Sequence, residues 1–365
     1  MISKASYFRF HKYLGLIGAA FFLVQSLTGL TLVFGPEVAQ LIDPAGMTSR
    51  AGKGDAAPAR LLATAEKLYP GFHIERLVYP VRPSSTYLVH VENANGVIRY
   101  VSLDRHSASV LRTGSIWHFP VEAALNIHNQ WMSGTPGMVL ITTIGIVLLL
   151  TAAMGICFWW PRRGKLGKSL TIQWHLKPRA VLRQLHRTTG VTVSALLAFM
   201  AITGMFVSVP MIIGGTPAPW STTQSFAPRI ESAIRLAEQQ FPGKSIRDVR
   251  MPSPTQISVF LLAPERNSMA VHRVIIDTRG PRIESVRNAF DDSAPWVIAE
   301  PLHNGQDFGV AGQLIIVLIG LSLVTLASTG PIMWYQARRA RQRTGRAPSR
   351  HASREIARTE FGSSL

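Results

Sequence analysis

Four long apolar segments limit what this chain can fold into. They cover residues 13–35, 138–160, 191–213 and 310–334, and none of them contains Asp, Glu, Lys or Arg. A helix rises about 1.5 Å per residue, so roughly 20 apolar residues cross a hydrocarbon layer about 30 Å thick. The sequence therefore predicts a membrane α-helical protein, a four-helix transmembrane bundle surrounded by the lipid bilayer.

The basic residues are distributed unevenly along the chain. Segments 1–12, 161–189 and 336–365 hold 19 of the 38 Lys and Arg but only two of the 20 Asp and Glu, whereas the two long loops are nearly balanced. By the positive-inside rule, both termini and the middle loop are cytoplasmic and the long loops are exported. We therefore expect a multi-pass protein of a bacterial inner membrane. The basic residues are not gathered on one soluble face, so a nucleic-acid partner is not expected.

An alternative for the first apolar segment is a cleaved signal peptide, because Lys4, Arg9 and Lys12 precede it. The segment is longer than the usual apolar core of such peptides, which favours a retained transmembrane helix.

The chain repeats itself at a distance of 175 residues. Each half reads as span, exported loop, span, which predicts a parallel internal duplication about an axis along the membrane normal. The matching positions are His11 and His186, Lys12 and Arg187, Gly15 and Gly190, Thr28-Gly29 and Thr203-Gly204, His128-Asn129 and His303-Asn304, and Gly155 and Gly330.

Each exported loop carries a helical pattern followed by alternating, strand-like segments, which predicts a small α+β unit. The helices are expected at 59–68 and 230–240, and the strands at 85–92, 96–103, 256–262 and 269–277. The predicted order is N-terminus and first span 1–35, exported domain 36–135, second span 136–160, basic loop 161–189, third span 190–213, second exported domain 214–308, fourth span 309–335 and basic tail 336–365.

Four of the eleven histidines pair across the repeat, and all four lie near the start of a span. The predicted topology places His11 and His186 on the cytoplasmic side, and His128 and His303 on the exported side. Two imidazoles from opposite halves suit a haem iron with no open position, whereas bare zinc or copper needs more ligands. The sequence thus predicts two haem b groups. We expect the other seven histidines, residues 73, 90, 106, 118, 175, 272 and 351, to be structural or surface residues.

Glycines lie near the cytoplasmic histidines, where helices must spread around a flat macrocycle. Gly15 and Gly190 are one turn from their histidines and Gly18 shares the face of Gly15, so we expect them to pack on haem, although glycine is also common at ordinary membrane helix contacts. Nearby basic residues could neutralise haem propionates or could simply be positive-inside flanking residues; they are Arg9, Lys12 and Arg187.

Three sequence motifs resemble the PepSY-associated transmembrane family of iron-regulated membrane proteins. They are Phe10-His11-Lys12-Tyr13-Leu14-Gly15, Trp159-Trp160-Pro161-Arg162-Arg163 and Pro301-Leu302-His303-Asn304-Gly305. The resemblance implies two periplasmic PepSY-like domains, axial haem ligation by the four paired histidines, and ferric-siderophore reduction that releases iron in the periplasm. The chain departs from the family where Asn129-Gln130-Trp131-Met132 replaces a longer polar stretch.

The electron donor is expected to be a separate molecule. The longest cytoplasmic segment is about 30 residues, too short for a flavin or nicotinamide domain, and it has no Gly-x-Gly-x-x-Gly motif after a strand. A quinol or a soluble cytoplasmic reductase would serve. The alternatives to an oxidoreductase are a siderophore or iron transporter component and a non-enzymatic PepSY sensor. No catalytic side chain is assigned.

Overall fold

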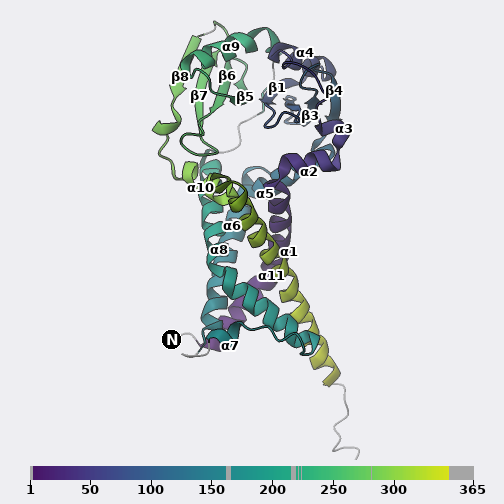
Figure 1. Cartoon of the computed structure of the whole chain (residues 1–365), viewed down its shortest axis with the longest axis vertical. Coiled ribbons are helices and arrows are strands. Elements are labelled where there is room, and N and C mark those ends of the chain that lie inside the picture. The colour runs from purple at the N-terminus through teal and green to yellow at the C-terminus, as the bar shows by residue number, and fades with distance from the viewer. Residues whose placement is uncertain are drawn as a thin grey trace, which may run out of the picture.

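The computed structural model is a long helical bundle that carries a mixed α/β head at one end (Figure 1). It describes residues 3–161, 166–214, 219–220, 222, 224–280 and 282–344. Part of the predicted basic loop, 162–165, and the end of the predicted tail, 345–365, lie outside the described residues.

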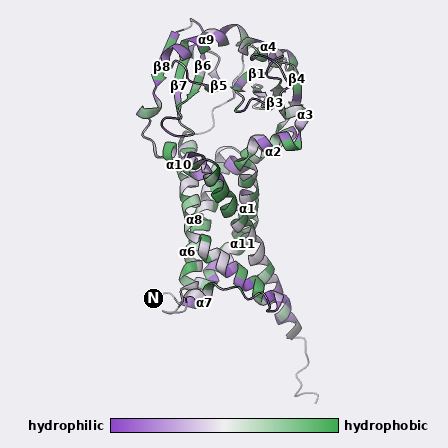
Figure 2. Cartoon of the chain, viewed as in Figure 1, coloured by the Kyte–Doolittle hydropathy of each residue, from purple (hydrophilic) through white to green (hydrophobic). Residues whose placement is uncertain are grey.

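Within the described residues, four helices are long and apolar enough to cross a membrane. They are α1 (Lys4–Val33), α6 (Thr135–Trp159), α8 (Pro178–Gly214) and α11 (Gly309–Thr344). Figure 2 shows hydrophobic residues along the bundle and hydrophilic residues in the head and at the far end. The four predicted spans are therefore confirmed, although α8 begins before the predicted third span and α11 continues into the predicted tail.

The bundle places α1 and α8 on a diagonal. Helix α1 packs against α6 and α11, and α8 packs against the same two helices. Diagonal helices face each other across the middle of the bundle, so side chains from α1 and α8 can meet there.

Two short helices join the bundle to the head. Helix α5 (Pro120–Gln130) packs on α1 and α6, and α10 (Pro295–Asn304) packs mainly on α8. Left-handed residues end both, with φ of 45° at Trp131 and 72° at Gly305. Such residues stop an α-helix, so His128 and His303 lie on separate helices rather than at the start of the spans.

In the described part of the head, eight strands form one antiparallel sheet in the order β4-β3-β2-β1-β5-β6-β7-β8. Helices α4 (Pro58–Leu68) and α9 (Ala227–Gln240) cover one of its faces, with a core that includes Leu61, Val89, Ile230 and Val259. The strands are β1 (His73–Val78), β2 (Tyr87–Glu92), β3 (Ile98–Leu103), β4 (Val110–Gly114), β5 (Ile246–Ser253), β6 (Gln256–Leu262), β7 (Val271–Asp277) and β8 (Arg282–Arg287). The remaining short elements are α2 (Gly35–Ile42), α3 (Pro44–Met47), η1 (Ile116–His118), α7 (Leu166–Leu170), η2 (Ala289–Asp291) and η3 (Gln306–Phe308).

The two loops contribute four strands each and meet at β1 and β5, where Leu77 lies opposite Val249. The sequence interpretation treated them as two separate units and did not anticipate the shared sheet. Pairing β1 with β5 removes two exposed strand edges, which would otherwise be open to association with other chains.

Asp248 holds this seam together. Its carboxylate is fully buried and accepts from Arg76, Arg247 and Arg250 at 3.1, 2.8 and 2.6 Å. Burial raises the pKa of Asp248, but the arginines outweigh this effect and hold the pKa below its ordinary value.

We expect Asp248→Asn to destabilise the head by about 3 kcal/mol, because three partly buried arginines lose their counter-charge. The measurement is thermal unfolding of the purified chain, with exposed Asp291→Asn as the control. A carboxylate whose pKa is lowered in the folded state stabilises that state at pH values above the unfolded pKa. The unfolding temperatures of the native and variant proteins should therefore begin to converge as the pH falls below about 4. Equal unfolding temperatures at neutral pH would contradict this role.

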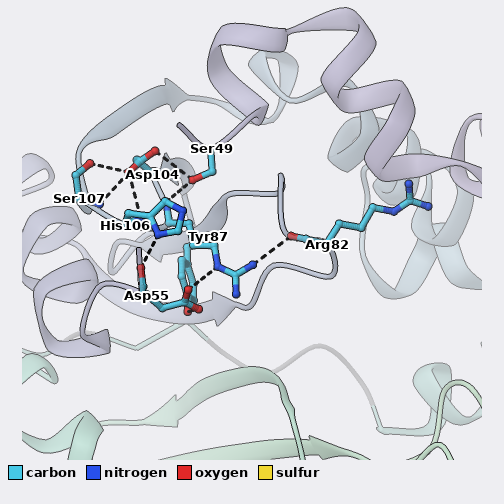
Figure 3. Close-up of polar contacts among 9 residues, drawn as sticks. Ser49, Asp55, Arg82, Tyr87, Asp104, His106 and Ser107 are labelled. Carbon is cyan, nitrogen blue, oxygen red and sulfur yellow. Dashed lines mark hydrogen bonds and ion pairs between the residues drawn. The ribbon is translucent and has the colours of Figure 1, made fainter. Parts of the chain in front are cut away.

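A second buried carboxylate orders the turn between β3 and β4 (Figure 3). Asp104 accepts from the backbone N–H groups of Arg50, His106 and Ser107 and from the hydroxyl of Ser49. Burial raises its pKa, yet these hydrogen bonds hold the pKa below the ordinary value. Donors from the turn and from residues 49–50 satisfy the carboxylate, so we assign it a structural role.

Candidate functional site

Two histidines meet inside the bundle at the end far from the head. His11 lies on α1 and His186 on α8, and their ring centres are 6.2 Å apart. The Nδ1 of His11 bonds the backbone oxygen of Thr151 on α6 at 2.8 Å, and the Nδ1 of His186 bonds the hydroxyl of Thr329 on α11 at 2.8 Å. Each ring is therefore oriented by a neighbouring helix, with Nε2 left for another partner.

A second pair lies at the head end of the bundle. His128 on α5 and His303 on α10 have ring centres 6.3 Å apart. The Nδ1 of His128 bonds the backbone oxygen of Gln25 and the hydroxyl of Thr28, both at 3.1 Å, and the Nδ1 of His303 bonds the hydroxyl of Thr203 at 3.0 Å. Among the described residues, none of the four Nε2 atoms makes a hydrogen bond.

The ring separations fit two imidazoles on one metal ion. A bond from a first-row metal to an imidazole nitrogen is about 2 Å long, and the ring centre lies about 1.2 Å behind that nitrogen. Two imidazoles that share one ion from opposite sides would therefore have ring centres about 6.4 Å apart. Both pairs show this separation, and both have the Nδ1 hydrogen bonds that typically orient ligating histidines.

A glycine backs each imidazole. A Cβ atom at Gly155 would lie 3.1 Å from the His11 ring, and a Cβ at Gly29 would lie 3.0 Å from His128. Gly204 and Gly330 occupy the same place behind the other two rings, at 3.1 Å from His303 and 3.7 Å from His186. Each imidazole ring thus packs against a glycine on a helix from its own half of the chain, and its partner ring comes from the other half.

The donor set fits haem. In the described part of the chain, no group of three or more His, Cys, Asp or Glu could hold a bare metal ion. Burial lowers the pKa of both His128 and His303, so the neutral form needed for metal ligation prevails. His11 with His186, and His128 with His303, would each hold a haem iron through two neutral imidazoles, and the bound haem would supply one-electron redox chemistry.

The family described as PepSY-associated TM region matches residues 8–337. This chain belongs to that family. The matched segment contains both histidine pairs and the whole sheet, in agreement with the resemblance found in the sequence. A search of curated proteins found no match.

The other sequence-predicted site residues of this family member are less central. A Cβ at Gly15 would meet Thr151 at 3.8 Å and one at Gly190 would meet Leu326 at 3.5 Å, while Gly18 lies under the ring of Phe22 on its own helix. Gly15 and Gly190 thus face the neighbouring helices α6 and α11, and the packing of these three glycines on haem stays a prediction. Lys12 lies over the Tyr13 ring, Arg187 donates to the backbone oxygen of Thr171, and Arg9 is exposed.

Most of the histidines that have no match in the other half of the chain lie in or near the head. His73 and His90 face Glu92 and Glu75 at 3.5 and 3.3 Å, and His272 faces Glu265 at 3.5 Å. His106, His118 and His175 are partly or fully exposed, and residue 351 lies outside the described residues.

Sequence reasoning missed the residues that seat the imidazoles. Thr28-Gly29 and Thr203-Gly204 were visible as repeat matches, and so were Gly155 and Gly330. A threonine that hydrogen-bonds an imidazole, followed directly by a glycine that packs against the same imidazole, would have been a usable signal. Thr151 and Thr329 are not related by the repeat distance, so only the structure identifies them.

Proposed function

We propose that this protein is a di-haem b transmembrane electron-transfer protein, an oxidoreductase that reduces a ferric siderophore or related ferric chelate on the exported side. The observation that supports it is the presence of two bis-histidine pairs at opposite ends of one apolar bundle, each with the ring separation that a shared iron requires.

The topology follows the charge distribution. The far end of the bundle and both termini face the cytoplasm of a bacterial inner membrane, and the head lies in the periplasm as a pair of joined PepSY-like units. The two halves of the chain would then be related by internal duplication. Haem would supply a one-electron Fe(III)/Fe(II) couple at each site.

The protein's own residues hold these two sites in register. Thr28, which contacts the head-end pair, lies 17 residues after His11 on the same helix. At about 1.5 Å per residue the two sites are separated by roughly 25 Å along α1, close to the thickness of the hydrocarbon core. Buried apolar side chains between them, Phe22, Ile144, Leu197 and Ile319, exclude water from the space between the sites.

The overall reaction balances with a donor from the cytoplasmic side. A quinol gives up two electrons and two protons, and each electron converts one chelated Fe(III) to Fe(II). Hard oxygen ligands hold Fe(II) more weakly, so the metal leaves and the chelator stays intact. A soluble reductase is the other possible donor, and electron counting is the same.

The direct test is a reduced-minus-oxidised absorption spectrum of the purified protein, with haem quantified per chain. We expect two haem b per chain, and a chain that binds no haem would refute the proposal. A haem-free sensor predicts no chromophore, and a transporter predicts iron uptake into sealed vesicles that contain no reductant. We expect iron release in such vesicles only when a donor is added.

A further inference from the structure

Arginines gather on the face of the sheet opposite α4 and α9. Four residues on adjacent strands lie directly opposite one another: Asp248 on β5, Phe260 on β6, Arg273 on β7 and Arg287 on β8. Arg250 is two residues from Asp248 on the same strand, and its guanidinium lies 4.6 Å from the centre of the Phe260 ring. We call Arg250, Arg273 and Arg287, with Arg266 in the turn after β6, the arginine face.

Positive charge on this face is only partly compensated. Arg273 and Arg287 are direct cross-strand neighbours, an arrangement that is destabilising for like charges. Neither makes an ion pair or a hydrogen bond within the described ranges. Burial lowers the pKa of Arg273, and Arg287 and Arg250 add to this effect, while Asp292 opposes it.

Arg266 provides a second, independent observation. One of its terminal nitrogens donates to the backbone oxygen of Asp292, while the other is buried and has no hydrogen-bond partner among the residues that the structure describes. A buried, unpartnered guanidinium nitrogen is costly, and an anion would satisfy it.

The arginine face lies beside the helix that carries the head-end ligand. Glu300 on α10 is within electrostatic range of Arg247 and Arg250. His303 follows three residues later, about 4.5 Å along the same helix axis. A molecule bound on the arginine face would thus lie near the head-end histidine pair.

We propose that the arginine face is the docking site for the ferric chelate, and that it selects chelates with a net negative charge carried by carboxylate oxygens. The inference rests on the proposed function and adds to it the class of substrate. Guanidinium groups bind carboxylates in a bidentate manner, and the Phe260 ring offers a flat apolar surface beside them.

The test is binding of a redox-inert probe, which requires no electron transfer. Gallium(III) citrate is anionic and gallium(III) desferrioxamine B is cationic, so titration calorimetry of the full chain with both probes measures charge selection. We expect the native protein to bind the citrate complex at least about tenfold more tightly than the cationic complex. The double variant Arg273→Gln, Arg287→Gln should lose at least about tenfold in affinity for gallium citrate.

The double variant should fold, because it removes a like-charge pair and breaks no ion pair. The matched control is Arg235→Gln, which changes an exposed arginine on α9 across the sheet and should bind as the native protein does. Equal affinity of native and double-variant proteins, or no binding of gallium citrate by the native protein, would overturn the docking proposal.

Haem content separates the remaining outcomes. A double variant that loses the head-end haem would assign these arginines to haem propionates and would also overturn the proposal. Binding of gallium citrate by a chain without haem would support the docking site while refuting the electron-transfer function. A chain with two haems that does not bind gallium citrate would support the electron-transfer function and refute the docking site.

Discussion

Replacing His303 with Ala should remove one of the two haems and reduce the rate of chelate reduction by at least about 100-fold. The substitution leaves His128 as a single imidazole ligand at the head end, whereas the far pair of His11 and His186 is about 25 Å away and stays intact. The measurements are haem per chain and the rate of Fe(II) release from a ferric chelate with a quinol as donor.

The reciprocal variant makes the same experiment sharper. His186→Ala should remove the far-end haem and leave the head-end spectrum, so the two variants should give complementary difference spectra. His118→Ala, at an exposed histidine near the same end as His303, is the control and should retain both haems. Loss of both haems, or of neither, in the His303 variant would show that the pairing across halves is wrong.

Gly29→Val should have nearly as large an effect on the head-end site. A Cβ at this position already lies 3.0 Å from the His128 ring, closer than ordinary contact, and valine adds two methyl groups beyond it. The ring cannot keep both its hydrogen bond to Thr28 and its place opposite His303. We expect head-end haem occupancy to fall at least about fivefold, measured as haem per chain, with the far site unaffected.

A graded series checks that the effect is steric. Gly29→Ala should give a smaller loss than Gly29→Val, because one methyl group requires the ring to move by only a few tenths of an ångström. Gly15→Ala adds the same methyl group on the same helix, but its Cβ would meet Thr151 at 3.8 Å, an ordinary contact. That control should keep both haems. Full head-end haem occupancy in Gly29→Val would refute the role of Gly29 in positioning the His128 ring.

The sequence could predict the four spans because transmembrane helices need about 20 uninterrupted apolar residues. The sequence also indicated the pairs His11 and His186, and His128 and His303, because the members of each pair occupy equivalent positions in the two halves, 175 residues apart. In the head, the predicted helices and strands agree with α4, β2, β3, α9, β6 and β7.

Other features depend on contacts that no local pattern reports. The pairing of β1 with β5 joins strands from different loops, and two separate sheets would satisfy the same alternation. The short helices α5 and α10 end at left-handed residues, one of them Trp131, which is not a typical helix terminator. The hydrogen bond from His11 ends on a backbone oxygen, at Thr151, and side-chain identity does not encode that acceptor.

The seating of the imidazoles has a consequence for assembly. Every ring is backed by a glycine from its own half, whereas its partner ring belongs to the other half, so a single half would carry two prepared ligands and no complete site. Two separate half-length chains could complete the sites only by dimerising, and their metal affinity would vary with dilution. Joining the halves in one polypeptide replaces that bimolecular step with a fixed effective concentration, so ligand pairing survives even at very low copy number.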